Sequence, residues 1–313
     1  MMRIGLDVMG GDYAPDATLG GAILARQILP SDVQLVLIGD QKIIEEYLQN
    51  KGVSSTGFEI VPSTEIIEMG DHPAKAFSQK TQSSIHIGFQ LLQAGKIDGF
   101  ASAGSTGAMM VGAMYTVKSI PGIIRPAITG PIPKLNGGSS ILLDVGLNAD
   151  CKHDVLYQYG ILGSLYAEYV YNVEKPKVAL LNIGEEEEKG NLLTKASYQA
   201  MHGTTDFNFI GNIEGNEIFD DKADVVVCDG FVGNVVLKQA EAFYKISRKL
   251  KLKDAYFDRF NFENYGGTPV LGINSNVIIG HGISNDVAIK NMVLLTKDVI
   301  SANLPSKIKQ YFK

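Results

Sequence analysis

Short apolar runs alternate with stretches of helical periodicity along most of the chain. The apolar runs are rich in Val, Ile and Leu and show little polar alternation, which is typical of parallel strands covered on both faces. They predict strands at Ile4–Val8, Val33–Ile38, Phe58–Val61, Phe100–Ala101, Ile141–Val145, Val178–Ile183, Phe207–Ile210 and Val225–Cys228.

Many of these runs are followed by apolar residues at three- and four-residue spacing. This spacing predicts helices at Ala17–Leu29, Ile43–Leu48, Ile85–Leu92, Ala108–Val117, Val155–Tyr169, Leu192–Met201 and Val235–Leu250. Strand, turn and helix repeated in this order predict a doubly wound α/β sheet. The sequence contains no short repeat, low-complexity segment or flexible linker. We therefore expect one α/β domain over residues 1–313, which could comprise two interleaved subdomains, and we draw no boundary.

The composition narrows the class of protein. Hydrophobic residues make up 45% and charged residues 20%, which is ordinary for a globular chain. The formal net charge of -6 argues against a nucleic-acid partner, because proteins that bind nucleic acids are usually basic. The N-terminus lacks a charged region followed by an apolar segment, and no apolar run approaches the roughly 20 residues that span a bilayer. We expect a cytoplasmic protein whose only possible membrane contact is peripheral.

Four loops that follow apolar runs carry glycines beside polar side chains. In a doubly wound sheet, ligands bind beyond the carboxyl ends of the strands, where these loops lie. A glycine after a strand is often plain turn geometry, but four such loops together predict a pocket of backbone donors that suits a phosphate or an oxyanion. The candidate phosphate-binding residues are Gly10, Gly11, Asp12, Gly104, Ser105, Thr106, Gly107, Asp144, Asn148, Asp229, Gly230 and Asn234.

Two further residues are candidates for catalysis. Lys189 lies between an acidic run and a Gly-Asn helix start, after the predicted strand Val178–Ile183. There its ammonium could neutralise a phosphate or a developing oxyanion. His281 lies in a Gly-His-Gly loop after the apolar run Val277–Ile279. It fits a proton donor to a leaving group and a structural hydrogen bond equally well.

Other reactive groups form no constellation. Cys151 is followed by Lys152 and His153, which could lower the pKa of its thiol, but a nucleophilic role is the less favoured interpretation. Cys228 ends an apolar run and is expected to be a small core residue. No spacing of His, Cys and carboxylates suggests a metal site. Neither a dinucleotide fingerprint nor a Walker A pattern occurs, so we expect no cofactor.

Motifs over nearly the whole chain, from Met2 to about Asn285, occur in the order of one bacterial family. They are DVMGGDYAP, ASAGSTGAMM, RPAITGPIP, LLDVGLNAD, LLNIGEEEEKGNLLTK, NFIGNIEGNEIF, ADVVVCDGFVGNVVLK, NYGGTPVLG and HGISN. Together they resemble the phosphate acyltransferases of phospholipid synthesis. The resemblance implies transfer of a fatty acyl group from acyl-[acyl carrier protein] to inorganic phosphate, which gives acyl phosphate for glycerophospholipid synthesis. It also implies a homodimer and a fold similar to isocitrate and isopropylmalate dehydrogenases, and Lys189 corresponds to the lysine proposed to act in the reaction.

The chain departs from the family pattern in three places. Ser105 stands where the family loop usually has asparagine. His72 replaces a usual acid and Ser78 a usual arginine, so an arginine role in that segment does not carry over. The stretch Lys245–Asn264 is shorter than the helical pair of relatives, which is linked with dimer contact and membrane association. Membrane recruitment is therefore left open.

The densest basic run lies in this shortened stretch and comprises Lys245, Arg248, Lys249, Lys251 and Lys253, interleaved with apolar residues. Acyl carrier protein is strongly acidic and this chain is acidic too, so docking would need a local basic patch. The run could dock the carrier, contact anionic lipid, line a dimer, or form a solvated helix face. A membrane acyltransferase is left open as a further partner of the protein.

Other functions stay open from the sequence. A short-chain phosphate acyltransferase that uses coenzyme A thioesters would need similar anion-binding loops. A dehydrogenase of the isopropylmalate type would need metal-binding aspartates and a nicotinamide site, which we do not find. A non-catalytic protein that binds phosphate or an acyl ligand is the third alternative.

Overall fold

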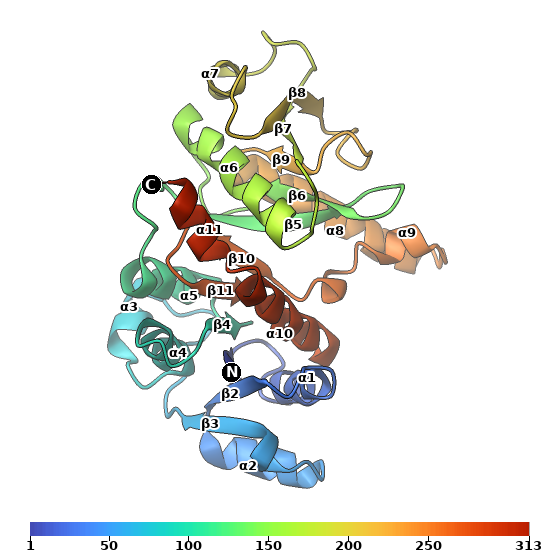
Figure 1. Ribbon diagram of the computed structural model, residues 1–313. Helices are drawn as coiled ribbons and strands as arrows, with labels where there is room; N and C mark the ends of the chain where they lie inside the picture. The colour runs from blue at the N-terminus through green and yellow to red at the C-terminus, as the bar shows by residue number, and fades with distance from the viewer. Residues whose placement is uncertain (313) are drawn as a thin grey trace. The chain divides into compact units, whose positions relative to one another are not determined.

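The computed structural model describes residues 1–312, and the chain forms two compact units (Figure 1). Unit 1 comprises Met1–Ser119 and Phe262–Asn303. Unit 2 comprises Ile120–Asn261 and the chain from Leu304 onward. The chain thus leaves unit 1 after its first 119 residues and returns to it later. The treatment of residues 1–313 as one domain stays a prediction.

Unit 1 contains a mainly parallel sheet with the strand order β3-β2-β1-β4-β11-β10. Neighbouring strands are parallel except β10 and β11, which are antiparallel. The strands are β1 (Met2–Asp7), β2 (Val33–Gly39), β3 (Phe58–Pro62), β4 (Gly99–Ser102), β10 (Thr268–Leu271) and β11 (Asn276–Ile279).

Helices cover both faces of this sheet. Gly99 faces Ile300 of one helix, whereas the next residue, Phe100, packs against Gly88 of another, and successive side chains of a strand point to opposite faces. The helices that pack on the Gly99 face or on each other there are α1 (Asp16–Arg26), α2 (Gln41–Asn50) and α10 (Asp286–Ser301). The Phe100 face is covered by α4 (Ser84–Gln93), which packs with α5 (Thr106–Gly112) and its continuation η2 (Ala113–Val117), while α3 (Pro73–Gln79) contacts α5. Short helical turns complete the unit at η1 (Ser55–Gly57) and η3 (Phe262–Asn264).

Unit 2 contains strands in the order β5-β6-β9-β7-β8. Only the pair β5 and β6 is antiparallel. The strands are β5 (Ala127–Pro133), β6 (Ser139–Leu143), β7 (Lys177–Asn182), β8 (Asn208–Glu214) and β9 (Val225–Val227).

The sheet of unit 2 is also covered on both faces. Val225 packs against Gly163 of α6, while its neighbour Val226 belongs to a core cluster with Val236 and Phe243 of α8. The first face carries α6 (His153–Tyr169), α7 (Leu192–Met201) and α11 (Leu304–Tyr311), and the second carries α8 (Gly230–Lys249) and α9 (Ala255–Asp258). The doubly wound α/β class expected from the sequence is therefore confirmed.

Some boundaries differ from the sequence expectation. The strand expected to reach Val145 ends at Leu143, and the helix expected from Val235 begins at Gly230. The early start follows from a cap, because the Asp229 carboxylate accepts the backbone N–H groups of the first helical turn. Among the helices of residues 1–312, none combines the length and apolar character that a bilayer span requires.

Candidate functional site

Three loops of unit 1 leave neighbouring parallel strands at the same edge of the sheet. β4 lies between β1 and β11, so the loops that follow these strands begin side by side. The Asp12 N–H donates to the Gly282 carbonyl at 2.8 Å, and the Gly280 N–H donates to the Ser102 carbonyl at 2.8 Å. The two glycine loops predicted from the N-terminal half thus lie together, and the loop that carries His281 joins them.

The backbones of the first two loops approach each other very closely. A Cβ atom added at Gly10 would lie 2.8 Å from both the N and the Cα of Gly104. Gly11 has a φ of +114°, which disfavours any residue with a side chain. A Cβ at Gly107 would lie 2.4 Å from the ring of Pro73. Three of the glycines predicted for a phosphate cradle are therefore required by the local geometry.

A buried aspartate that the sequence reasoning missed holds these loops in place. Asp7, at the end of β1, is fully buried, and its Oδ2 accepts the Ser102 hydroxyl at 2.7 Å. Its Oδ1 accepts the Met9 N–H at 3.0 Å, while the Ser102 Oγ accepts the Gly104 N–H at 2.9 Å. Burial raises the pKa of Asp7, against the hydrogen bonds that favour its charged form. The available signal was an aspartate inside the apolar run Ile4–Val8, shortly before the Gly-Gly loop.

The start of α5 completes the unit 1 cradle. The Ser105 hydroxyl caps the helix by accepting the Ala108 N–H at 3.3 Å. The N–H groups of Thr106 and Gly107 lie in the first turn, where no intrahelical acceptor exists, and they form no hydrogen bond with residues 1–312. These open donors beside two closely packed glycine loops are suited to an anion with several oxygens.

His281 is held within its own loop. Its ring packs on Phe262 with 5.0 Å between ring centroids, and its carbonyl accepts the Ser284 hydroxyl at 2.5 Å. The Ile283 N–H lies 3.5 Å from Nδ1. Through the Gly280 and Gly282 hydrogen bonds, this loop is attached to the glycine cradle.

Unit 2 brings the other two predicted loops together. They follow β6 and β9, which are parallel neighbours. The Gly230 N–H donates to the Asn148 carbonyl at 2.7 Å, and the Asn234 amide donates to the Val145 carbonyl at 3.0 Å. A Cβ at Gly233 would lie 1.9 Å from the Asp144 carbonyl oxygen, so this contact also depends on a glycine.

The polar side chains of these two loops mainly form hydrogen bonds with other groups of the protein. The buried Asp144 carboxylate accepts the N–H groups of Ile128 at 3.2 Å and Asn148 at 2.6 Å, and burial raises its pKa. The Asn148 amide donates to the Tyr159 hydroxyl at 2.8 Å. Asp229 caps α8 through Oδ1, which accepts the Val232 N–H at 2.9 Å. Asp144 therefore serves as an internal anchor that shapes the loop.

The two cysteines are both embedded in unit 2. Burial raises the pKa of the Cys151 thiol, so the lowering considered for its basic neighbours is wrong. The positive charge of Arg125, which lowers the thiol pKa, does not outweigh the loss of solvent around the thiol. Cys228 is 4% exposed and belongs to a core cluster, which confirms the expectation of a small core residue.

Lys189 lies in the loop between β7 and α7 and is exposed. The Asn182 amide donates to its carbonyl at 3.1 Å, and a Cβ at Gly190 would lie 2.3 Å from the Asn182 Oδ1. The loop is thus fixed at the end of β7, although its acidic residues are exposed. The Lys189 ammonium forms no ion pair or hydrogen bond with residues 1–312.

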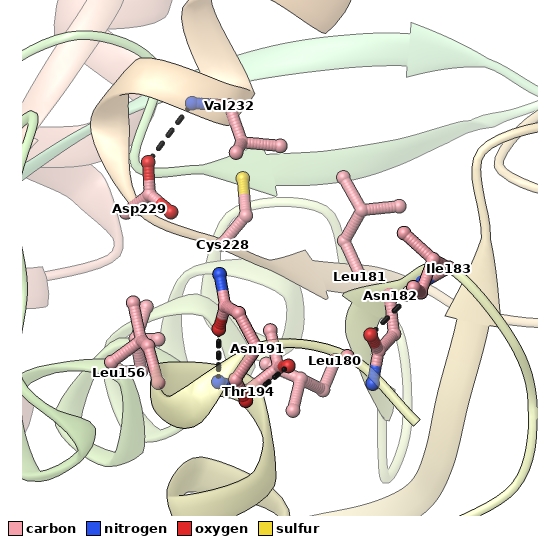
Figure 2. Close-up of a pocket in the computed structure, with 12 residues that line it drawn as sticks. Leu156, Leu180, Leu181, Asn182, Ile183, Asn191, Thr194, Cys228, Asp229 and Val232 are labelled. Carbon is pink, nitrogen blue, oxygen red and sulfur yellow. Dashed lines mark hydrogen bonds between the residues drawn. The ribbon is translucent and has the colours of Figure 1, made fainter.

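A cavity of about 220 Å³ lies beside this loop, at the carboxyl ends of β7 and β9 (Figure 2). Its lining combines leucines from the sheet and from α6 with residues of α7 and the start of α8. The residues are Leu156, Leu180, Leu181, Asn182, Ile183, Gly190, Asn191, Leu193, Thr194, Cys228, Asp229 and Val232. Sequence reasoning had not located this cavity.

The predicted basic run lies at the end of α8 and in the turn that follows. Its five members, Lys245, Arg248, Lys249, Lys251 and Lys253, are all exposed and form no ion pair with the described part of the chain. On the same segment Leu250 is 64% exposed, while Phe243 and Tyr244 pack against the core of unit 2. The run is therefore a basic surface with exposed apolar side chains. Elsewhere within residues 1–312, no cluster of three or more His, Cys, Asp or Glu side chains is arranged to hold a metal ion.

Comparisons with known sequences identify close relatives. A family model described as "Fatty acid synthesis protein" matches residues 2–256. The "Phosphate acyltransferase" of Dictyoglomus turgidum is 42% identical over 326 residues, which covers 98% of this chain and 96% of the relative. The "Phosphate acyltransferase" of Endomicrobium trichonymphae is 41% identical over 332 residues and covers 99% of this chain and 97% of the relative.

Solved structures share the fold at low sequence identity. The EutD phosphotransacetylase from Staphylococcus aureus aligns with a TM-score of 0.65 at 19% identity, over 96% of this chain and 94% of the other. The 4-hydroxythreonine-4-phosphate dehydrogenase from Klebsiella pneumoniae aligns with a TM-score of 0.55 at 11% identity, over 96% of this chain and 98% of the other. These likenesses concern the α/β fold alone.

Proposed function

The chain belongs to the phosphate acyltransferase family, and from this premise we propose that it transfers a fatty acyl group from acyl-[acyl carrier protein] to inorganic phosphate. The products are acyl phosphate and the free carrier thiol. The observation that supports this proposal is the cradle of unit 1, in which Gly10 and Gly104 meet backbone to backbone beside the open N–H groups of α5. Such a site offers several backbone N–H groups that can donate hydrogen bonds to a phosphate.

Phosphate is the nucleophile in this reaction. It is already partly dianionic at neutral pH, so the protein does not need a serine or cysteine intermediate. The cradle of unit 1 holds the phosphate with one oxygen about 3–3.5 Å from the thioester carbon. That oxygen forms the new C–O bond, and the carbonyl becomes a tetrahedral oxyanion. The C–S bond then breaks, and the electron pair leaves with the carrier thiolate.

Lys189 corresponds to the lysine that the family resemblance assigns to the reaction. Its ammonium has no carboxylate partner within residues 1–312, and its proposed role is to stabilise developing negative charge. The thiolate is a stable leaving group, so strong acid catalysis is not required. His281, which is attached to the phosphate cradle through its loop, supplies a proton to the thiolate or simply supports the loop.

The basic run at the end of α8 is proposed to dock the acidic carrier protein. Five exposed cations on one segment give a local positive surface on a chain whose net charge is -6. A homodimer, a cytoplasmic location and a peripheral membrane contact are the accompanying expectations from the sequence.

The proposal is tested by incubating the purified protein with palmitoyl-acyl carrier protein, with and without phosphate. Free thiol and hydroxylamine-trapped acyl phosphate are measured together. Both products should appear only when phosphate is present. Turnover of coenzyme A thioesters alone would point to the short-chain alternative, and no turnover of either donor by the folded protein would contradict catalysis.

A single substitution links this activity to the cradle. In Gly10→Ala, the new Cβ would lie 2.3 Å from the Asp7 Oδ2 and would push the two loops apart. We expect the KM for phosphate to rise by about tenfold or more, since the backbone donors are displaced. Gly70→Ala is the matched control, because nothing lies within 4 Å of a Cβ at that position. An unchanged KM in Gly10→Ala would remove the cradle from the proposal.

A further inference from the structure

The cavity of unit 2 is lined by none of the glycine-loop residues of unit 1, and it lies next to the proposed catalytic lysine. Gly190 and Asn191, which line it, directly follow Lys189 in the chain. Asn182, another lining residue, donates a hydrogen bond to the Lys189 carbonyl at 3.1 Å. One end of the cavity is therefore built from the same loop that carries the Lys189 ammonium.

The interior of the cavity is apolar. Leu156, Leu180 and Cys228 are almost completely buried and come from α6, β7 and the end of β9. Leu193 is half-buried and Val232 is exposed, and they contribute further apolar surface from α7 and α8. Figure 2 shows leucine and valine side chains of α6, β7 and α8 around one space. Among residues 1–312, Asp229 is the one charged side chain in the lining.

Three side-chain oxygens of the lining already accept hydrogen bonds from the protein's own backbone. The Asp229 Oδ1 accepts the Val232 N–H at 2.9 Å, and the Asn191 Oδ1 accepts the Thr194 N–H at 2.9 Å, as the dashed lines in Figure 2 show. The Asn182 Oδ1 accepts the Ile183 N–H at 2.9 Å. Because these oxygens cap the protein's own backbone, a ligand inside the cavity does not need to satisfy them. A hydrocarbon chain meets this condition, whereas a sugar or nucleotide would leave its polar groups unpaired.

We propose that this cavity binds the hydrocarbon chain of the acyl thioester, with the thioester at the Lys189 end. This inference rests on the proposed acyl transfer and names the part of the protein that recognises the acyl group. Since a dry apolar cavity of about 150 Å³ holds one benzene molecule, the 220 Å³ here corresponds to about nine carbon atoms. Longer chains extend beyond the cavity.

The size of the cavity leads to a definite dependence on chain length. Each methylene group moved from water into an apolar site strengthens binding by about fourfold. We therefore expect kcat/KM to rise by up to about fourfold per carbon until the chain fills the cavity, and then to level off. The carrier protein is common to all substrates, so its docking cancels from the comparison.

The experiment uses acyl-[acyl carrier protein] substrates with even chains from four to sixteen carbons. Wild-type protein is compared with Leu193→Trp, which fills the cavity, and with Leu192→Trp. Leu192 precedes Leu193 on α7, is 90% exposed and does not line the cavity, so it is a matched control. In Leu193→Trp the ratio of kcat/KM for ten carbons to that for four carbons should fall at least tenfold. In Leu192→Trp this ratio should stay at the wild-type value.

A binding measurement separates this inference from the proposed reaction. Decanoate binding to each protein is followed by calorimetry without phosphate or carrier, and it should be lost in Leu193→Trp and kept in Leu192→Trp. If acyl phosphate forms but both the chain-length profile and decanoate binding are the same in all three proteins, the cavity assignment is overturned while the acyl transfer stands. If decanoate binding follows the expected pattern but no thioester reacts, the cavity still binds the acyl chain and the proposed reaction fails.

Discussion

The Lys189 ammonium has no ion-pair partner among residues 1–312, whereas two acids of the same loop are engaged. Glu185 pairs with Lys222 at 2.8 Å, and Glu187 accepts the Tyr198 hydroxyl at 3.1 Å, whereas the Lys189 ammonium contacts no acid within residues 1–312. A cation in an ion pair would have to break that ion pair before it could stabilise a new negative charge. An unpaired one, held at the end of a strand, is ready to stabilise a developing oxyanion.

We therefore predict that Lys189→Ala lowers kcat by at least about tenfold, since the loss of one oxyanion-stabilising group typically costs roughly 10²–10³ in turnover. The fold should be unaffected, because the side chain is exposed and unbonded. Steady-state kinetics with phosphate and acyl carrier protein substrates measure the effect. Lys195→Ala, which removes another exposed lysine from the adjacent helix α7, is the control. Wild-type turnover in Lys189→Ala would exclude this lysine from the mechanism.

Asp7 shows how a buried acid can serve an anion site without facing the anion. Its carboxylate is enclosed beneath the glycine loops, where it accepts the Ser102 hydroxyl and the Met9 N–H. Ser102 in turn accepts the Gly104 N–H, so one side chain fixes both loops. Burial raises the pKa of Asp7, which means that the folded protein binds its proton more tightly than the unfolded chain does.

This shift predicts a specific pH dependence of stability. The stabilising contribution of the Asp7 proton is fully present below the unfolded pKa of about 3.9 and is lost as the pH rises through the higher folded pKa. Asp7→Asn stays neutral throughout. The free energy of unfolding of Asp7→Asn, relative to wild type, should therefore increase as the pH is raised from acidic toward neutral values. Urea unfolding of both proteins across this range measures it, and a difference that stays constant with pH would contradict the raised pKa.

At the scale of elements, patterns within a short stretch of sequence were the best predictors of helices and strands. Buried parallel strands such as β2 and β7 are recognisable from continuous apolar runs. β5 was missed because Pro131, Pro133 and Gly130 interrupt its pattern, and prolines usually argue against a strand. β10 is only four residues long and contains Pro269. α10 was also missed, although its cap at Asn285 is the kind of signal that marks a helix start.

The candidate site was predictable only in part, for a topological reason. Loops after strands can be recognised locally, and the glycines at positions 10, 11, 104 and 107 were found in this way. The order of the strands cannot be read from local patterns. β11 pairs with β4 although more than half of the chain separates them, and this pairing alone brings the His281 loop to the glycine cradle. The proposed acyl cavity was likewise hidden, because its lining comes from four separate segments of the chain.

The end of α8 has some side chains in the core and others that face solvent. Phe243 packs into the core of unit 2, while Lys245, Arg248 and Lys249 face solvent. The cations are not neutralised by acids of the described chain, so their field is available to a partner. If the run were only a solvated helix face, its side chains would be equally exposed, but removing their charge would not change carrier binding.

We predict that the double charge reversal Arg248→Glu with Lys249→Glu weakens binding of acyl carrier protein by about tenfold at low salt, because two attractive charges become repulsive. The loss should shrink as salt is raised, since exposed charges are screened. Calorimetry at two salt concentrations measures both effects. Lys42→Glu with Lys51→Glu changes the net charge equally but lies at α2 of unit 1, and it should leave carrier binding unchanged. Equal binding by both double variants would assign the basic run to lipid or to a dimer.

At the scale of the whole molecule, the proposed tasks are divided between two units. The closely packed glycine loops belong to unit 1, whereas Lys189, the apolar cavity and the basic run belong to unit 2. Each unit contains mainly parallel strands, and each places candidate residues at the carboxyl ends of such strands. The reaction requires binding of an anion and of a hydrocarbon chain. We thus propose that each binds at a site of different construction.

This division predicts how phosphate alone should affect the protein. A ligand that binds only the native state stabilises it by about 2.7 kcal/mol at a hundredfold excess over its Kd. Phosphate should therefore raise the melting temperature and slow amide exchange at residues 9–12 and 103–107, where the cradle lies, while exchange along the cavity residues Leu193 and Thr194 stays unchanged. Chloride at matched ionic strength is the control, because it cannot accept the set of donors that a phosphate can. Protection that spared the cradle would show that phosphate binds elsewhere, and the assignment of the nucleophile to unit 1 would then fail.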